Sequence, residues 1–245
     1  MLEMEVKVDV LKQMVGILQS TVGEVKMVFD KDGLTVRAVD PAHIAMVELV
    51  AEASVFDSYE ADKNVLGVQL SAVMDTLKLL KGDQTMRITV DEDGKLEMRF
   101  GQGMRRVTLL DIEGLSDPKV PPLTPAVNLK VRGSDVLQGM KVTQDIFDLI
   151  TIVATEAGLS VESKSEASAG SWLIGKDTLL QYEPPENEVK SSYAKDYFVS
   201  MCRAMGSADE LELAFGQDYP MMVRFQLFDG KVRVLALLAP RIEND

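Results

Sequence analysis

The sequence predicts an α+β protein made of two copies of one unit. Three observations lead to this fold class. Short runs that alternate apolar and polar residues end at turn residues, as half-buried strands do. Four longer runs carry apolar residues at helical spacing. A segment without either periodicity lies near the middle of the chain, and similar sequence words occur before and after it.

The aperiodic segment, residues 112–125, separates the two units. It carries four of the nine prolines in a chain of 245 residues. Proline lacks a backbone donor and biases the preceding residue toward extended conformations, so the segment should be extended and unpaired. Each half then has about 110 to 120 residues, a common domain size. We predict an N-terminal domain over 1–113, a connecting linker over 114–126 and a C-terminal domain over 127–245.

In the first half, we expect a strand at the N-terminus, where MLEMEVKV alternates apolar and charged residues. Asp9 is a suitable cap for a helix over residues 10–22, whose apolar stripe includes Met14 and Leu18. A second helix is expected over 71–81, where Gly82 ends it. The other strands are expected over residues 25–29, 34–39, 44–51, 85–91, 95–100 and 104–112.

The second half repeats this order after the connecting segment. Helices are expected over residues 136–144 and 197–205. The segment 163–187 fits the repeat least well, because SKSEASAG is typical of a loop and only 177–183 reads as a strand, at a sheet edge. The other strands are expected over residues 127–132, 149–155, 159–163, 210–215, 221–228 and 232–238.

Repeated words support an internal duplication. Gly33 matches Gly158 at an offset of 125, and Gly82 matches Gly206 at an offset of 124. The word Asp9-Val10-Leu11-x-x-Met14 recurs at an offset of 126 as Asp135-Val136-Leu137-x-x-Met140. Three anchors at nearly one offset predict one unit, built as strand, helix, strands, helix, strands, and present twice.

Composition excludes most catalytic classes. With one histidine and one cysteine, a single chain cannot assemble a His/Cys zinc cluster, and no glycine-rich phosphate-binding motif is present. We therefore predict no enzyme, no metal site and no cofactor, and keep a carboxylate-dependent hydrolase as a minor alternative. No apolar run approaches the roughly 20 residues of a membrane span, and the N-terminus does not resemble a signal peptide.

Charge is unevenly distributed over the predicted helices. The formal net charge of −13 argues against a nucleic-acid binder, because Lys and Arg supply affinity for phosphate. The four predicted helices nevertheless carry one acidic residue, Asp75, and five basic ones, Lys12, Lys78, Lys81, Lys141 and Arg203. Either an anionic partner lies along the helices, or the depletion of acids is a chance result in a small sample of good helix formers.

Longer sequence words resemble a known family, the archaeal-type DNA sliding clamps of the proliferating cell nuclear antigen family. The resemblance covers nearly the whole chain. Its words are Gly33-Leu34-x-x-Arg37-Ala38-x-Asp40-x-x-His43-Ile44-Ala45-Met46-Val47, the terminal Leu238-Ala239-Pro240-Arg241-Ile242-Glu243, and the linker between duplicated halves.

The resemblance implies the sliding-clamp fold, with helices on the inner face and antiparallel sheets outside. Three identical or related subunits, here expected as a homotrimer, would encircle duplex DNA as a processivity factor in the nucleoid of a prokaryotic cytoplasm. The five basic residues named above would then face DNA phosphates. At some positions where relatives often have basic residues, this chain has Gln13, Gln19, Asp75 and Gln138. The electrostatic attraction between the helices and DNA should therefore be weak. A ring-shaped protein scaffold that does not work by encircling DNA is the alternative.

The resemblance also implies a pocket for short peptides of partner enzymes, which insert apolar and aromatic anchors. The expected partners are DNA polymerase, clamp loader, flap endonuclease and DNA ligase. Alternatively, His43 serves the DPAH corner and Pro240 only ends a strand. The pocket residues would be Val39, His43, Ile44, Leu115, Val120, Leu237, Ala239, Pro240 and Arg241.

Ring closure in the family pairs edge strands of neighbouring subunits. By resemblance, these strands are residues 104–112 and about 177–183. Such pairing would cover two edges that otherwise invite aggregation. The interface candidates are Arg105, Arg106, Leu109, Leu179 and Tyr182.

Overall fold

The computed structural model describes residues 2–242, which form two compact units. Unit 1 comprises residues up to 40 together with 47–120 and 227–233. Unit 2 comprises residues 41–46, 121–226 and those from 234 onward. A division at the linker alone would put residues 41–46 in the first unit and 227–233 in the second. The compact units differ from that division in these two segments.

Unit 1 contains the helices α1 (Val8–Gln19) and α2 (Leu70–Leu77). Strands β5, β1, β7, β8 and β9 form an antiparallel sheet in that order, and β4, β3, β2 and β6 are neighbours in a second sheet. The strands of unit 1 are β1 (Leu2–Lys7), β2 (Glu24–Asp30), β3 (Gly33–Val39), β4 (Ala45–Glu52), β5 (Ser58–Ala61), β6 (Asn64–Gln69), β7 (Thr85–Val90), β8 (Leu96–Phe100) and β9 (Gly103–Val107), with a 3₁₀ turn at Ala53–Val55.

Unit 2 has the same arrangement, with helices α3 (Gly133–Thr143) and α4 (Lys195–Met205). Its strands follow the orders β14-β10-β16-β17-β18 and β13-β12-β11-β15, which match the two orders of unit 1 strand for strand. These strands are β10 (Val127–Val131), β11 (Leu149–Thr155), β12 (Gly158–Lys164), β13 (Ala169–Gly175), β14 (Gln181–Tyr182), β15 (Val189–Ala194), β16 (Leu211–Phe215), β17 (Met221–Leu227) and β18 (Val232–Leu238), of which β18 begins in unit 1. The predicted duplicated α+β fold is confirmed.

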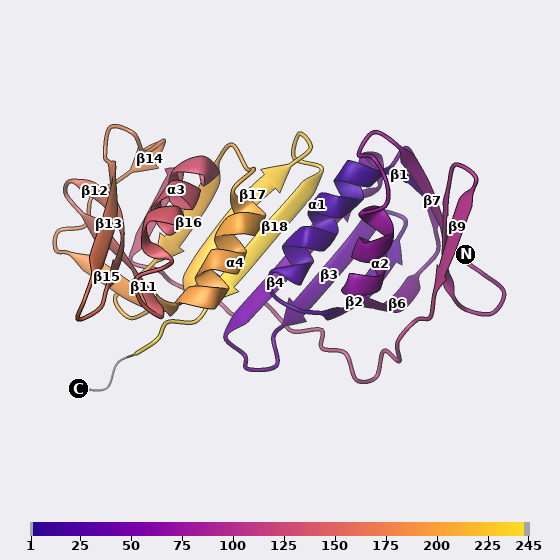
Figure 1. The fold of residues 1–245 in the computed structure, drawn as a ribbon, viewed down its shortest axis with the longest axis horizontal. Helices are drawn as coiled ribbons and strands as arrows, with labels where there is room; N and C mark the ends of the chain where they lie inside the picture. Colours follow the sequence, from indigo (N-terminus) through magenta and orange to yellow (C-terminus); the bar gives the residue numbers. More distant parts are fainter. Residues whose placement is uncertain (1, 243–245) are drawn as a thin grey trace. The chain divides into compact units, whose positions relative to one another are not determined.

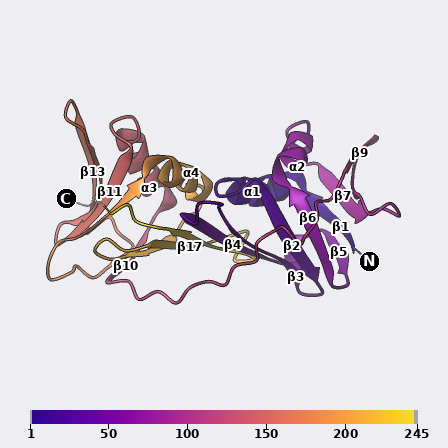
Figure 2. The same ribbon diagram turned by 90° about the horizontal axis from the view of Figure 1, so that it is seen from below.

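Within each unit, the two helices lie next to each other on one side of the strands (Figure 1, Figure 2). In unit 1, Leu11, Met14 and Leu18 of α1 are buried together with Met4 and Val6 of β1. The opposite faces of the helices remain open to solvent, because their apolar residues form a stripe on one side only.

The helices begin differently from the prediction. Lys7, and not Asp9, occupies the N-cap of α1, and no side chain caps the helix. The N–H groups of Val8 and Asp9 instead donate to the carbonyls of Gln84 and Gly82 at 2.9 and 3.1 Å. Since neighbouring backbone satisfies these donors, a helix can start directly after a strand without a capping side chain.

Several predicted strands are wrong in extent. The strand expected over 104–112 ends at Val107, and beyond it Leu110 forms only an isolated bridge with Gly67. Of the strand expected over 177–183, only Gln181 and Tyr182 pair. The loop expected at SKSEASAG instead leads into the seven-residue strand β13. The strands β5, β6 and β15 were also absent from the prediction.

Local contacts, as well as the strand order, are the same in the two units. Gly33 has φ 140° and Gly158 has φ 138°, and an added Cβ would lie 2.0 Å from the carbonyl of Ala51 or 2.2 Å from that of Ile174. Both positions need glycine, because L side chains avoid this conformation and no space is left for one. The contacts also show that β13 is the counterpart of β4.

Two tyrosines hold these same hairpins. The hydroxyl of Tyr59 donates to the carbonyls of Asp30 and Gly33, both at 2.7 Å. The hydroxyl of Tyr182 lies 2.6 Å from the carbonyl of Thr155 and 3.3 Å from that of Gly158. Burial raises the pKa of both tyrosines, that of Tyr59 to about 12, so each hydroxyl remains a donor at neutral pH.

Within residues 2–242, no helix combines the length and apolar character needed to cross a membrane.

Candidate functional site

The basic residues predicted to contact DNA lie on or directly after the helices. Lys12, Lys141 and Arg203 belong to α1, α3 and α4. Lys78 and Lys81 lie beyond α2, which ends at Leu77 and closes through tighter i to i+3 hydrogen bonds, so their placement in the helix was wrong. The predicted charge count of the helices is also wrong, because they begin earlier than expected and include Asp9, Asp135 and Asp196, so the helix layer carries only part of the basic set.

These side chains differ in their freedom to meet a ligand. The ammonium of Lys12 donates to the carbonyl of Leu80 at 2.9 Å, and Lys78 lies 3.3 Å from Asp75. The side chains of Lys81, Lys141 and Arg203 are exposed. Exposed Lys and Arg make phosphate contacts in water at little desolvation cost. Lys12 would have to leave the carbonyl of Leu80, or use another of its three N–H groups for the phosphate.

The residues predicted to form the peptide pocket are divided between the units. Val39, Leu115 and Val120 belong to unit 1, where all three are partly exposed. In unit 2, the structure brings Ile44 and Ala239 together, because the N–H of Ala239 donates to the carbonyl of Ile44 at 2.8 Å. The other predicted pocket residues of unit 2 are His43, Leu237, Pro240 and Arg241.

The C-terminal pocket residues are in an extended segment. The N–H of Arg241 donates to the carbonyl of Ser192 at 2.7 Å, while its side chain is exposed. Leu237 is buried inside unit 2, at 7% exposure. His43 is exposed and has φ 56°, a left-handed conformation that is uncommon outside glycine, which fits a tight corner at DPAH.

The arginines predicted for the first interface strand point to opposite faces of β9. Arg105 is paired in register with buried Met98, so it lies on the core-facing side of the sheet edge, where its side chain is exposed. Arg106 pairs with Glu97 on the other face. Leu109 lies beyond the strand. The two arginines therefore lie on opposite faces of the sheet edge.

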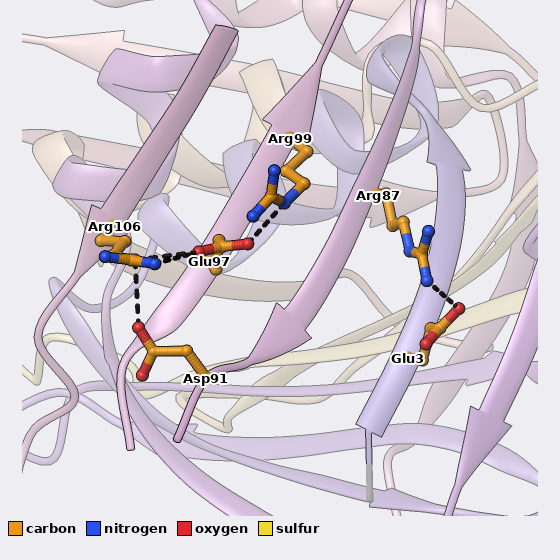
Figure 3. A network of polar contacts seen from close by, with 6 residues as sticks. All are labelled: Glu3, Arg87, Asp91, Glu97, Arg99 and Arg106. Atoms are coloured by element: carbon orange, nitrogen blue, oxygen red, sulfur yellow. Dashed lines mark hydrogen bonds and ion pairs between the residues drawn. The ribbon is translucent and has the colours of Figure 1, made fainter. Parts of the chain in front are cut away.

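A polar network holds Arg106 in place (Figure 3). Its guanidinium lies 2.8 Å from Glu97 and 3.1 Å from Asp91, and Arg99 donates to the other oxygen of Glu97 at 2.5 Å. The hydrogen bond from Arg106 holds the pKa of Glu97 below its usual value, and burial partly opposes this effect. Arg87 pairs separately with Glu3 across β7 and β1 at 2.6 Å.

The second predicted interface strand needs a correction. Leu179 is buried within unit 2, and the hydroxyl of Tyr182 is bound to the β11–β12 hairpin. Gln181 and Tyr182 do lie at a sheet edge, as β14, but a longer terminal strand of unit 2 is β13, on which Trp172 and Leu173 are 37% and 53% exposed. The sequence reading missed β13 because its small and polar residues are typical of loops.

Apolar side chains gather beside β13. A Cβ on Gly139 of α3 would lie 3.3 Å from Trp172, so this ring packs directly on the helix. Val142, near the end of α3, is 38% exposed, and its Cγ1 would lie 3.8 Å from a Cβ on Gly170 of β13. Together with Trp172 we call it the apolar edge cluster. Exposed apolar groups beside a terminal strand make this face a candidate interaction surface.

The first repeat covers the equivalent positions. Counting from the matching hairpin carbonyls of Ala51 and Ile174, Trp172 corresponds to Leu49, which is fully buried. Counting from the helix starts, Val142 corresponds to Ile17, which is 4% exposed. The sequence words alone, at an offset of 126, align Val142 with Gly16, so the observed helix starts were needed to find this correspondence.

Comparisons with known proteins agree with this architecture. Residues 1–108 match the family model for the N-terminal domain of proliferating cell nuclear antigen. Over all of both chains, the sequence is 31% identical to a DNA polymerase sliding clamp of Thermoplasma volcanium and 29% identical to one of Methanosarcina barkeri.

Solved structures show the same similarity. The PCNA of A. fulgidus, solved with the C-terminal region of FEN-1 bound, superposes with a TM-score of 0.91 at 25% identity, and all of both chains is covered. PCNA of Thermococcus kodakaraensis has a TM-score of 0.88 at 21% identity, with 98% of this chain and all of that chain covered, which shows the shared fold.

Proposed function

The chain belongs to the proliferating cell nuclear antigen family of archaeal-type DNA polymerase sliding clamps, and from this premise we propose that three copies close into a ring around duplex DNA. Its function is that of a DNA polymerase sliding clamp, a processivity factor in DNA replication. The observation that carries the ring proposal concerns two terminal strands, β9 in unit 1 and β13 in unit 2. Their counterparts in the other repeat, β18 and β4, contact each other within unit 1, whereas β9 and β13 have no such partner among the described residues.

The duplication predicts how these two edges meet. Within unit 1, the end of β4 contacts the start of β18. The N–H of Glu52 donates to the backbone carbonyl of Lys231 at 2.8 Å, and the carboxylate of Glu52 lies 2.7 Å from the guanidinium of Arg233. In the repeat, β13 corresponds to β4 and β9 corresponds to β18. We therefore place β13 of one copy against β9 of the next. Such a head-to-tail contact generates a ring when its rotation closes.

The apolar edge cluster supports the same contact. Backbone pairing alone leaves apolar side chains beside β13 in water, and an incoming copy would cover them as Leu49 and Ile17 are covered in the first repeat. Large aromatic residues at the centre of an interface commonly carry much of its binding energy. Trp172 is accordingly our candidate for the strongest single contribution, and Arg105 and Arg106 stay as candidates on the opposing strand.

Duplex DNA is the proposed ligand of the helix layer. Nonspecific contact with phosphates leaves the clamp free to slide, since no base is read. The surrounding acidic chain disfavours DNA elsewhere, because its net charge is −13. The basic residues proposed to face DNA are Lys12, Lys78, Lys81, Lys141 and Arg203.

Partner enzymes are proposed to bind through short peptides. The A. fulgidus relative was solved with the C-terminal region of FEN-1, which supports flap endonuclease as a partner here. DNA polymerase, clamp loader and DNA ligase are proposed by the same family function. The pocket is proposed to use the nine residues of the sequence analysis, with the connecting segment as one wall.

We propose that the chain itself catalyses no reaction and acts in the prokaryotic cytoplasm, at the nucleoid. Sliding clamps are processivity factors, and their action on the chromosome sets the proposed location. Among residues 2–242, no group of three or more His, Cys, Asp or Glu is arranged to hold a metal ion. The proposed division into 1–113, 114–126 and 127–245 describes the repeats by chain order.

A five-residue variant tests DNA encirclement. Replacing Lys12, Lys78, Lys81, Lys141 and Arg203 with Ala should reduce processive synthesis by the cognate polymerase and make the contact with DNA weaker and less salt-dependent, because each lost phosphate contact removes a counterion-release contribution. A matched control replaces five exposed lysines outside the helices, Lys31, Lys63, Lys164, Lys176 and Lys190. Equal activity of the two variants would contradict a DNA-facing role and favour a protein scaffold.

A further inference from the structure

The connecting segment is fastened to unit 1 at its start. The N–H of Leu110 donates to the carbonyl of Gly67 in β6 at 2.8 Å. A Cβ at Gly67 would lie 2.5 Å from the carbonyl oxygen of Leu110 and 3.0 Å from Cδ1 of Leu115. Such distances leave no room for a side chain. Gly67 therefore lets both the backbone and a leucine of the segment lie directly on β6.

An ion pair lies at the same point of the sheet. Lys26 of β2 is the register partner of Gly67 in β6, and its ammonium is 3.4 Å from the carboxylate of Asp117. The Lys26 side chain is 23% exposed, whereas that of Asp117 is 42% exposed. Exposed pairs of this kind contribute little alone. Here the pair adds to a backbone hydrogen bond and an apolar contact on neighbouring residues.

The segment is fastened to unit 2 at its other end. The N–H of Thr124 donates to the hydroxyl of Tyr219 at 3.1 Å. Tyr219 is itself held, because its carbonyl accepts hydrogen bonds from the hydroxyls of Ser191 at 3.1 Å and Tyr193 at 2.9 Å. Tyr193 is fully buried. The acceptor for Thr124 thus comes from a loop bound to β15.

The six residues between these points, PKVPPL at 118–123, are different. In the part of the chain that the structure describes, they make no hydrogen bond and belong to no helix or strand. Three of them are prolines, which restrict φ and carry no N–H. The stretch therefore offers a carbonyl at every residue but donors only at Lys119, Val120 and Leu123. An extended peptide that donates its own N–H groups is the partner that fits this edge.

We propose that Gly67 and Tyr219 are positioning residues that hold 118–123 as a preformed docking strand for an extended partner peptide. This inference rests on the proposed peptide-binding function and names two residues outside the predicted pocket. A segment that is fixed before binding loses less conformational freedom when the peptide docks, so affinity rises without a new contact. Loosening either end of the segment should weaken peptide binding without changing the residues that contact the peptide.

Spin labelling and peptide affinity test the inference on the full-length chain. A nitroxide attached at Lys119→Cys reports the mobility of 118–123, and labelling is selective because the native Cys202 is fully buried. The probe is a synthetic peptide with the sequence of the FEN-1 C-terminal region found on the A. fulgidus relative. The variants are Gly67→Ala and Tyr219→Phe. Gly16→Ala is the control, since a Cβ there meets no atom within 4 Å.

We expect sharper nitroxide lines and about tenfold weaker peptide binding in both variants, and neither change in the control. Tyr219→Phe removes only the hydroxyl, so it decides the question even if Gly67→Ala unfolds. Tyr219→Phe with wild-type mobility and affinity would overturn the inference. A wild-type chain that binds no peptide would instead refute the proposed partner pocket, and the nitroxide spectra would still decide whether the two residues fasten the segment.

Discussion

Replacing Trp172 with Ala should weaken ring closure more than any other single truncation in the apolar edge cluster. The side chain is 37% exposed in the isolated chain. For a residue with about 250 Å² of surface, covering this fraction removes about 90 Å² from water, which is worth about 2 kcal/mol at about 25 cal/mol per Å². Each contact between copies should then dissociate at about 30-fold higher concentration.

Sedimentation velocity over a dilution series measures this shift directly. The wild type should sediment as a species of three 27.0 kDa chains, and Trp172→Ala should separate into smaller species at higher concentration. Because Trp172 also packs on Gly139, urea unfolding of each variant must show that the units remain folded.

Leu180→Ala is the matched control for this experiment. Leu180 is 41% exposed and lies beside β14, within the strand that the sequence analysis expected at the interface. It should leave the dissociation midpoint unchanged. A midpoint that moves with Leu180→Ala and not with Trp172→Ala would refute the assignment of β13 as the closing edge.

Further predictions concern the network at β9 and the repeated hairpins. Arg106 lowers the folded-state pKa of Glu97, so the stabilisation is present above the unfolded value of about 4.3 and is lost as pH falls through the lower folded value. Glu97→Gln should therefore flatten the acid branch of a stability curve measured by urea unfolding, and an unchanged branch would exclude this role. Tyr59→Phe and Tyr182→Phe should each cost about 1 kcal/mol in the same assay, and unequal losses would show that the two hairpin contacts are not equivalent. Gly158→Ala should cost about 2 kcal/mol or more, because it adds a strained φ and a clash with Ile174, whereas a neutral effect on unfolding would contradict this tight hairpin geometry.

The duplicated fold could be predicted because local patterns carry it. Helical stripes around Met14 and Met140, and glycines at matching hairpins, are properties of short segments. Asp9 was wrongly predicted as a cap because the donors of α1 are satisfied by Gly82 and Gln84, which are distant in sequence. Such tertiary contacts leave no local signal.

The candidate interface was harder to predict, for a related reason. Arg105 and Arg106 were correctly located on an edge strand, but their opposite orientations follow from pairing with β8. β13 was missed because Ser171, Gly170 and Ala169 weaken any strand pattern, although Gly158 pointed to it through the repeat. The fastening role of Gly67 depends on a close approach that only the folded structure shows.

Retention on circular DNA tests the central claim most directly. The clamp is loaded by its cognate clamp loader onto a singly nicked circle, isolated by gel filtration, and the DNA is then cut once with a restriction enzyme. A closed ring should stay on the circle at high salt and leave within minutes of linearisation, because only topology holds it there. Equal retention on circular and linear DNA, or a chain that remains a 27.0 kDa monomer throughout, would contradict the account.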